Sequence, residues 1–150
     1  MFTAADLQTI KTAIQADATM SADWSAGNPG AVAAYLNAVP SSGPVSILRP
    51  DVTTQELAQA LDITELLALT QTQLSVLQLA GLARTLDFTN ANVTAGLAAV
   101  FPSTTTTYTN LMAVAQRAAT RLEALFSANS VCAQYGAQID ASTVILAMKS

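Results

Sequence analysis

Apolar residues recur along this chain mostly at the three- and four-residue spacing that builds one face of a helix. The first such pattern, at Leu7, Ile10 and Ile14, begins shortly after Thr3, a residue type favoured at helix N-caps. The spacing predicts an amphipathic helix over about residues 4–17. A turn-rich segment is expected after it, before the next helix start signal.

Further start signals divide the rest of the chain. Asn28 followed by Pro29 is typical of a helix start, and three Thr or Asp residues are followed three positions later by Glu or Gln, as in capping boxes. These signals predict the following helices: Asn28 to Val39, about 54–61, 64–69 and 71–84, Asn90 to Phe101, and a last helix from Asp140 or Ser142 that carries Val144, Ile145 and Met148. In the helix over 71–84, the apolar residues predicted to be buried are Leu74, Val76, Leu77 and Leu82.

The longest predicted helix spans about residues 106–128. Its helically spaced apolar residues are Leu111, Ala115, Ala118, Leu122, Leu125 and Phe126. Arg117 and Arg121 are four residues apart, so both guanidinium groups would project from another face of this helix. Two interpretations stay open: a solvated helix face, or a docking patch for an acidic surface of a partner protein, because a guanidinium group binds a carboxylate through two parallel hydrogen bonds.

Only two segments favour extended structure. Val45–Arg49 is a short run with β-branched residues between two prolines, and Val131–Tyr135 alternates before Gly136. If they pair, they form one small β element. The sequence therefore predicts an all-α fold, mainly a helical bundle of five to seven helices with at most one small β element, in a single helical domain over residues 1–150.

The composition changes what can be expected of the surface. Of the 150 residues, 51% are hydrophobic and only 11% are charged, whereas about 25% of residues are charged in an ordinary globular domain. The surface is therefore either a neutral one rich in Ala, Thr and Gln, or one that is partly buried against partners. The net charge is −4 and the six basic residues are scattered, which argues against autonomous nucleic-acid binding.

The chain shows no signal for secretion or for membrane insertion. Its N-terminal segment is amphipathic and includes acidic residues, unlike a secretory signal. Two long uncharged stretches have the length of a membrane span, Leu66–Ala83 and Phe88–Gln116. The first contains many Thr and Gln residues and the second is broken by Pro102, so neither is expected to span a membrane.

The chain also lacks most of the residues that carry out catalysis. It has no histidine and one cysteine, and its six glycines form no phosphate-binding motif. We therefore expect no enzyme activity, no metal and no cofactor. A hydrolase that uses two carboxylates, Glu56 with Asp62 or Glu65, stays an alternative, although their capping positions explain these acids without catalysis. Trp24 and Tyr35 are aromatic candidates for ligand stacking, but core or loop anchoring is the simpler interpretation.

Three segments resemble a family of tailed-phage structural proteins, the head–tail connectors or adaptors. They are TAADLQTIKTAIQADATMSADW, VTTQELAQALDITELLALTQTQLSVLQL, and LMAVAQRAATRLEALF followed by a short strand and a terminal helix. The resemblance covers nearly the whole chain. It rests on the order of the segments and on apolar patterns rather than on an invariant motif.

The resemblance implies a mechanical function in the neck of a virion that is assembled in the bacterial cytoplasm. Subunits would form a homo-oligomeric ring between the portal protein and tail or head-closure proteins. The ring would extend the DNA channel, so that DNA passes nearby without sequence-specific binding. Three other interpretations stay open: a capsid-decorating subunit, a tail-terminator subunit, and a non-viral helical module that binds a peptide or helix in a groove.

Overall fold

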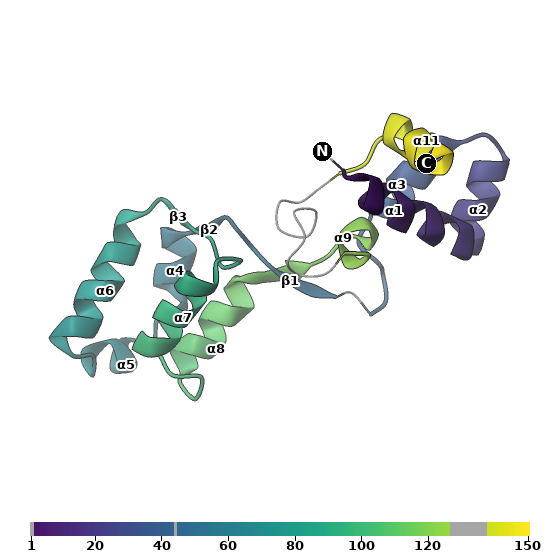
Figure 1. The fold of residues 1–150 in the computed structure, drawn as a ribbon. Helices are drawn as coiled ribbons and strands as arrows, with labels where there is room; N and C mark the ends of the chain where they lie inside the picture. Colours follow the sequence, from purple (N-terminus) through teal and green to yellow (C-terminus); the bar gives the residue numbers. More distant parts are fainter. Residues whose placement is uncertain (1, 44, 127–137) are drawn as a thin grey trace. The chain divides into compact units, whose positions relative to one another are not determined.

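The structure is a computed structural model that describes residues 2–43, 45–126 and 138–150. The predicted strand Val131–Tyr135, including Cys132, lies outside these residues. The described chain forms two compact units, shown in Figure 1. Unit 1 consists of Met1–Ser46 and Ala118–Ser150, and unit 2 consists of Ile47–Arg117. The single domain expected from the length stays a prediction, because compactness alone does not decide whether the two units unfold together.

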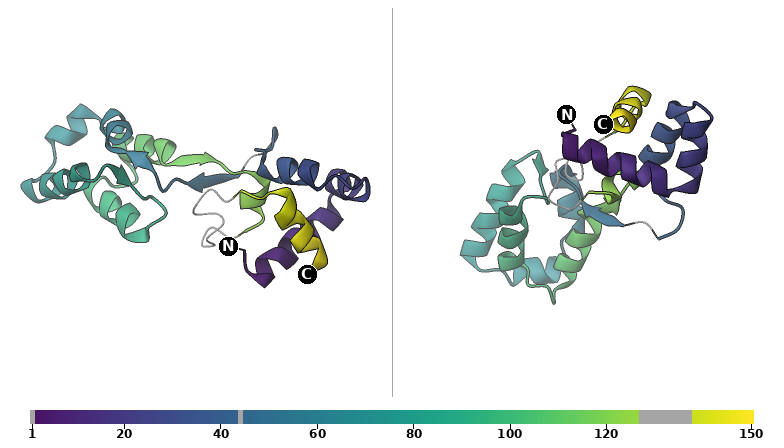
Figure 2. Two further views of the ribbon diagram at one scale, coloured as in Figure 1. Left: turned by 90° about the horizontal axis from the view of Figure 1, so that it is seen from above. Right: turned by 45° about the vertical axis from the view of Figure 1, so that its right-hand side comes forward.

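Unit 1 is mainly helical in its described part. Its helices are α1 (Ala4–Ala16), α2 (Ala18–Ser25), α3 (Pro29–Asn37), α9 (Arg121–Ala124) and α11 (Ala141–Lys149). The first and last of these, α1 and α11, pack together although they come from opposite ends of the sequence, as Figure 2 shows. Every described helix of unit 1 contributes at least one buried residue. The largest fully buried apolar side chains are Ile10, Ile14, Val32, Leu36, Leu122 and Val144.

A side chain fastens the C-terminal part of unit 1 to α3. The Nδ2 of Asn37 donates to the carbonyl oxygen of Ile139 at 2.7 Å, and the amide nitrogen of Ile139 donates to the Oδ1 of Asn37 at 3.0 Å. The amide side chain thus bonds both main-chain groups of Ile139, whose own side chain is buried. This clasp places the start of α11, which Asp140 caps, against the end of α3.

Unit 2 contains four longer helices, one short helix and a small antiparallel sheet. In chain order these elements are β2 (Val52–Thr53), α4 (Thr54–Ala60), α5 (Ile63–Leu67), α6 (Gln71–Leu82), β3 (Thr85–Leu86), α7 (Ala91–Val100) and α8 (Thr106–Val114). Strand β2 pairs with β3, with Val52 opposite Leu86. Helix α4 packs on α8, and α6 packs on α7. The core contains two phenylalanines, Phe88 and Phe101, each 1% exposed.

Two further strands, β1 (Ser46–Leu48) and β4 (Gln116–Ala118), pair where the chain passes from unit 1 into unit 2 and back. The predicted extended segment Val45–Arg49 is therefore confirmed. Its described partner is β4, a segment that the sequence assigned to the longest helix. With the β2–β3 pair, the described residues contain two small sheets, where at most one β element was predicted.

The prediction of one long helix over residues 106–128 is wrong. Helix α8 ends at Val114, β4 follows, and a new helix starts at Arg121 after the N-cap Thr120, whose side chain forms a capping box with that of Glu123. The predicted burial nevertheless holds for Leu111, Ala115 and Leu122.

The prediction of a turn-rich segment after residue 17 was also wrong. Asp17 caps α2 there, because its side chain accepts from the main-chain nitrogens of two residues in the first turn of that helix.

The mainly helical fold class is confirmed, but the chain is divided more finely than the sequence predicted. The described residues contain ten helices, more than the five to seven expected. Predicted caps at Thr3, Asn28, Thr53, Thr70 and Asn90 are all present. Two of the additional helices follow caps at Asp17 and Thr120, within segments that were predicted to be a turn and a continuous helix.

Candidate functional site

The two arginines predicted to share one helix face lie on different elements. Arg117 is in strand β4, and Arg121 is the first residue of helix α9. The prediction of a shared guanidinium face is therefore wrong, because a strand and a helix cap separate residues that a continuous helix would have aligned. Their role in protein binding stays a prediction that has lost its geometric basis.

Arg121 has a local role inside unit 1. Its Nη1 donates to the carbonyl oxygens of Tyr35 and Ala38, at 3.3 and 3.4 Å, and its main-chain nitrogen also donates to Ala38, at 3.0 Å. Its guanidinium carbon lies 4.0 Å from the centroid of the Tyr35 ring, which is a cation–π distance. Carbonyl groups at the end of a helix lack partners within that helix. Arg121 therefore completes the C-terminus of α3.

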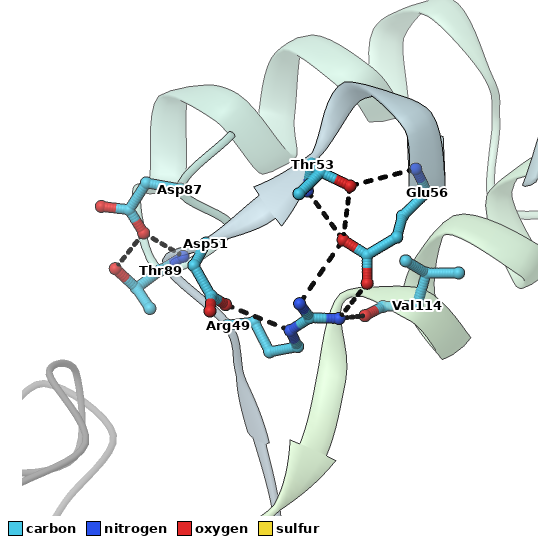
Figure 3. A network of polar contacts seen from close by, with 7 residues as sticks. All are labelled: Arg49, Asp51, Thr53, Glu56, Asp87, Thr89 and Val114. Carbon is cyan, nitrogen blue, oxygen red and sulfur yellow. Dashed lines mark hydrogen bonds and ion pairs between the residues drawn. The ribbon is translucent and has the colours of Figure 1, made fainter. Parts of the chain in front are cut away.

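An ion pair that several hydrogen bonds support joins Arg49 to Glu56 in unit 2 (Figure 3). The Nη1 of Arg49 lies 2.8 Å from the Oε1 of Glu56 and also donates to the carbonyl oxygen of Val114, at 3.2 Å. The Oε2 of Glu56 accepts from the main-chain nitrogen and the hydroxyl of Thr53, both at 2.8 Å. The Arg49 guanidinium first, and then Thr53, lower the pKa of Glu56 to about 2.

The carboxylate of Glu65 connects two helices of unit 2. Its Oε1 and Oε2 accept from the main-chain nitrogens of Thr106 and Thr107, both at 2.8 Å, at the start of α8. The hydroxyl of Thr107 in turn accepts from the main-chain nitrogen of Asp62, at 2.9 Å, and the Asp62 side chain caps α5. The hydrogen bonds from Thr107 and Thr106 lower the pKa of Glu65. These contacts fasten the N-terminus of α8 to α5.

These contacts explain each acid of the proposed carboxylate pair through local structure. A general acid in a glycosidase needs a raised pKa, whereas the pKa values of Glu56 and Glu65 are lowered. Glu56 lines an open hollow of about 550 Å³ with Arg49, Gln59 and Asn110, but its carboxylate is held by Arg49 and Thr53. Neither Asp62 nor Glu65 lines this hollow. The arrangement favours a structural role for all three acids.

The two aromatic candidates are anchored in unit 1. Trp24 and Tyr35 are partly buried and pack against its core. The hydroxyl of Tyr35 donates to the Oδ2 of Asp17, at 3.4 Å, while its ring faces Arg121. Tyr35 lines an open groove of about 480 Å³ together with Met20 and Arg121. Stacking on a ligand would require the Tyr35 ring face that Arg121 does not cover.

The most exposed apolar surface of the described residues lies on α5 and α6. Val76, Leu79 and Leu82 are 41%, 69% and 82% exposed, and their spacing of three residues aligns them along one side of α6. We call these three residues the α6 ridge. No residue of α6 is fully buried, so this helix attaches to unit 2 only through partly buried side chains such as Leu77. The predicted burial of Val76 and Leu82 was wrong.

Residues 66–83, which include all of α6, carry no charge. No Asp, Glu, Lys or Arg occurs between Glu65 and Arg84, so α6 carries no charged side chain. The neighbouring helix α5 adds two exposed apolar residues, Ile63 at 71% and Leu67 at 82%. Exposed apolar side chains that line up on one side of an uncharged helix, as on α6, favour a surface that binds another protein.

A second apolar surface lies on unit 1, along the side of α1 that faces away from its buried residues. It is an open groove of about 530 Å³, which we call the α1 groove. Its lining residues are small, polar or aliphatic, and none is charged: Ala5, Gln8, Thr9, Thr12, Ala13, Ala16 and Leu125. The charged residues of α1 are engaged elsewhere, Asp6 with Thr3 and Lys11 with the carbonyl oxygen of Ser150.

Comparison with known proteins identifies no relative. The sequence matches no family model, and neither a curated protein nor a solved structure matches it. Among the described helices, none is both long and apolar enough to cross a membrane. Within the same residues, no cluster of three or more His, Cys, Asp or Glu side chains has a geometry suited to a metal ion.

The spacing of the apolar residues in the sequence already indicates the α6 ridge. At 100° per residue, positions 76, 79 and 82 point away from positions 74 and 77, so all four apolar residues predicted to be buried cannot share one face. The sequence does not otherwise distinguish the exposed side of α6 from the packed side. Residues 66–83 include no Lys or Glu that would mark one side as solvent-exposed.

Proposed function

We propose that this protein is a structural subunit that acts by binding other protein subunits rather than by catalysis. The observation that carries the proposal is the α6 ridge, in which Leu79 and Leu82 are largely exposed on a helix without charges. Burying apolar side chains against a partner is favourable, whereas leaving them in water in a chain with few charges promotes association.

The particular assembly that we propose is the one implied by the resemblance, the neck of a tailed phage. There the subunits form a ring between the portal protein and tail or head-closure proteins. The acidic balance of the chain, with a net charge of −4, suits a channel through which DNA passes, because a wall that does not neutralise phosphates does not retain them. In this proposal the protein needs no cofactor.

The test is the position of the protein in an assembled particle. Antibodies against this chain, bound to gold and imaged on virions whose tails have been sheared off at the neck, are expected to label the exposed head vertex. A phage that lacks the gene should then produce filled heads without tails. Labelling over the whole capsid would favour a decorating subunit, and labelling at the distal end of the tail tube would contradict the neck assignment.

A further inference from the structure

We propose that the α6 ridge of one copy of this chain inserts into the α1 groove of a second copy. The inference rests on the proposed function and specifies its first partner, a second copy of the chain joined head to tail. Two surfaces carry it: exposed aliphatic side chains on unit 2, and a hollow on unit 1 whose lining residues are uncharged and include three alanines.

The two surfaces match in charge. The α6 ridge lies in a run of residues 66–83 without charges, and none of the residues lining the α1 groove is charged. A charged partner surface would lose its hydration at such a ridge without gaining a counter-charge, which is unfavourable. The groove of about 480 Å³ suits the ridge less well, because Asp17 and Arg121 line it.

The two surfaces also match in shape. Leu79 and Leu82 project from α6, whereas Ala5, Ala13 and Ala16 leave space along α1. Bulky side chains of one helix pack well into a groove left by small side chains on another. A volume of about 530 Å³ lies within the range of pockets that hold groups of this size.

The contact joins two different surfaces, which makes it heterologous. A symmetric dimer would use the same patch on both copies, whereas a ridge-to-groove contact leaves one free ridge and one free groove at the ends of every open oligomer. Repetition of such a contact gives a ring when the rotation between copies closes. This is the type of contact that a ring of identical neck subunits requires.

Sedimentation velocity of purified full-length variants tests this contact. Leu79→Asp places a charge on the ridge, and Thr12→Arg fills the groove with a charged side chain; both positions are exposed, so the fold should be retained. The wild-type protein is expected to associate as its concentration rises to about 1 mM, a range that detects contacts with Kd near that value. Each variant alone should remain monomeric.

The mixture of the two variants separates this contact from other kinds of association. Leu79→Asp keeps an intact groove and Thr12→Arg keeps an intact ridge, so an equimolar mixture should form dimers and nothing larger. The matched controls are Leu146→Asp, an exposed leucine on α11, and Gln15→Arg, an exposed residue of α1 outside the groove. Both should associate as the wild type does.

Three results would overturn the proposal: a wild-type protein that stays monomeric at every concentration, a Thr12→Arg variant that associates like the wild type, or a mixture that stays monomeric. Circular dichroism shows whether each variant is folded. A variant that loses its fold is replaced by Leu82→Gln for the ridge or Thr9→Arg for the groove. If the ridge-to-groove contact is not found, the proposed position in the neck is still tested by antibody labelling. That labelling does not depend on which surfaces join the copies.

Discussion

The two compact units are built from similar short, capped helices but differ in how much apolar surface they bury. Every described helix of unit 1 contributes to its core, including α9, which is only four residues long. In unit 2, α5 and α6 contribute no fully buried residue. The difference shows that caps can specify a helix well while apolar side chains on one of its sides stay exposed.

The units also differ in the polar contacts that fasten their elements. Unit 1 uses side chains that bond main-chain groups, as Asn37 does at Ile139 and Arg121 does at the end of α3. In unit 2, the side chain of Arg49 pairs with that of Glu56, and the carboxylate of Glu65 bonds main-chain nitrogens at the start of α8. Acid and salt should therefore change the stability of the two units to different extents. Substitutions of core residues should lower the stability of both units by similar amounts.

The largest effects are expected in the two cores. Phe88→Ala in unit 2 should lower the free energy of unfolding by about 3–5 kcal/mol and Leu122→Ala in unit 1 by about 2–5 kcal/mol, because both side chains are almost completely buried. Thermal and urea unfolding measure both losses. If residues 1–150 form the single predicted domain, both variants shift one shared transition; separate transitions, each shifted by one variant, would contradict the single domain.

The clasp in unit 1 should matter more than a single side-chain bond in unit 2. Asn37→Ala leaves the amide and carbonyl of Ile139 without their partner and should cost about 1–3 kcal/mol in unfolding free energy. The matched variant Asn110→Ala removes one bond, from Nδ2 to the carbonyl oxygen of Ala60, and should cost about 0.5–1.5 kcal/mol. Equal losses by urea titration would show that the clasp adds nothing beyond one hydrogen bond.

Acid should weaken unit 2 through Glu56. Its pKa in the folded protein is about 2, below its ordinary value of 4.5, so its stabilising contribution is complete above pH 4.5 and is lost as the pH falls towards 2. Glu56→Gln should therefore be less stable than the wild type at neutral pH and should lose less stability on acidification. Unfolding curves across this pH range measure the difference, which should disappear near pH 2.

Salt sharpens the comparison of acidic groups in the two units. The hydroxyl of Thr143, with its main-chain nitrogen and Ser142, lowers the pKa of Asp140 in unit 1 to about 2 without an arginine. Because salt screens the attraction between opposite charges, added salt should reduce the stability lost in Glu56→Gln but leave the loss in Asp140→Asn nearly unchanged. An equal effect of salt on the stability losses of Glu56→Gln and Asp140→Asn would contradict this difference between the two acids.

The smallest effect on folding is expected at the α6 ridge. Leu79 is 69% exposed, so Leu79→Gln should change the free energy of unfolding by less than about 0.5 kcal/mol at concentrations where the protein is monomeric. Leu77→Gln on the partly buried side of the same helix is the matched variant and should cost more. A larger loss for Leu79 than for Leu77 in urea titrations would place the ridge inside the folded chain.

Local signals predicted where many helices begin, because a cap is formed by residues only two or three positions apart. Thr53 with Glu56 and Thr70 with Gln73 are examples that the structure confirms. A further Thr-x-x-Glu pattern, Thr120 with Glu123, was present in the sequence and marks the break that the predicted helix over 106–128 overlooked.

The strands and the candidate surfaces were harder to predict because they depend on residues far apart in the sequence. Gln116–Ala118 becomes a strand because β1 supplies its partner, and the helical spacing of Ala115 and Leu122 gave no sign of it. The α1 groove likewise combines a face of α1 with Leu125. The sequence shows which residues are apolar, but not which apolar side of a helix stays exposed in the fold.

Hydroxyl-radical footprinting tests most directly the central claim that the α6 ridge is covered by protein in the assembled state. Side chains react with the radical in proportion to their exposure, so Leu79 and Leu82 should be modified readily in the dilute subunit. In purified particles their modification should fall several-fold. The exposed Leu146 of α11 is the internal reference, because neither proposed surface includes it. Equal modification of the two ridge leucines in dilute subunit and particle would contradict the account.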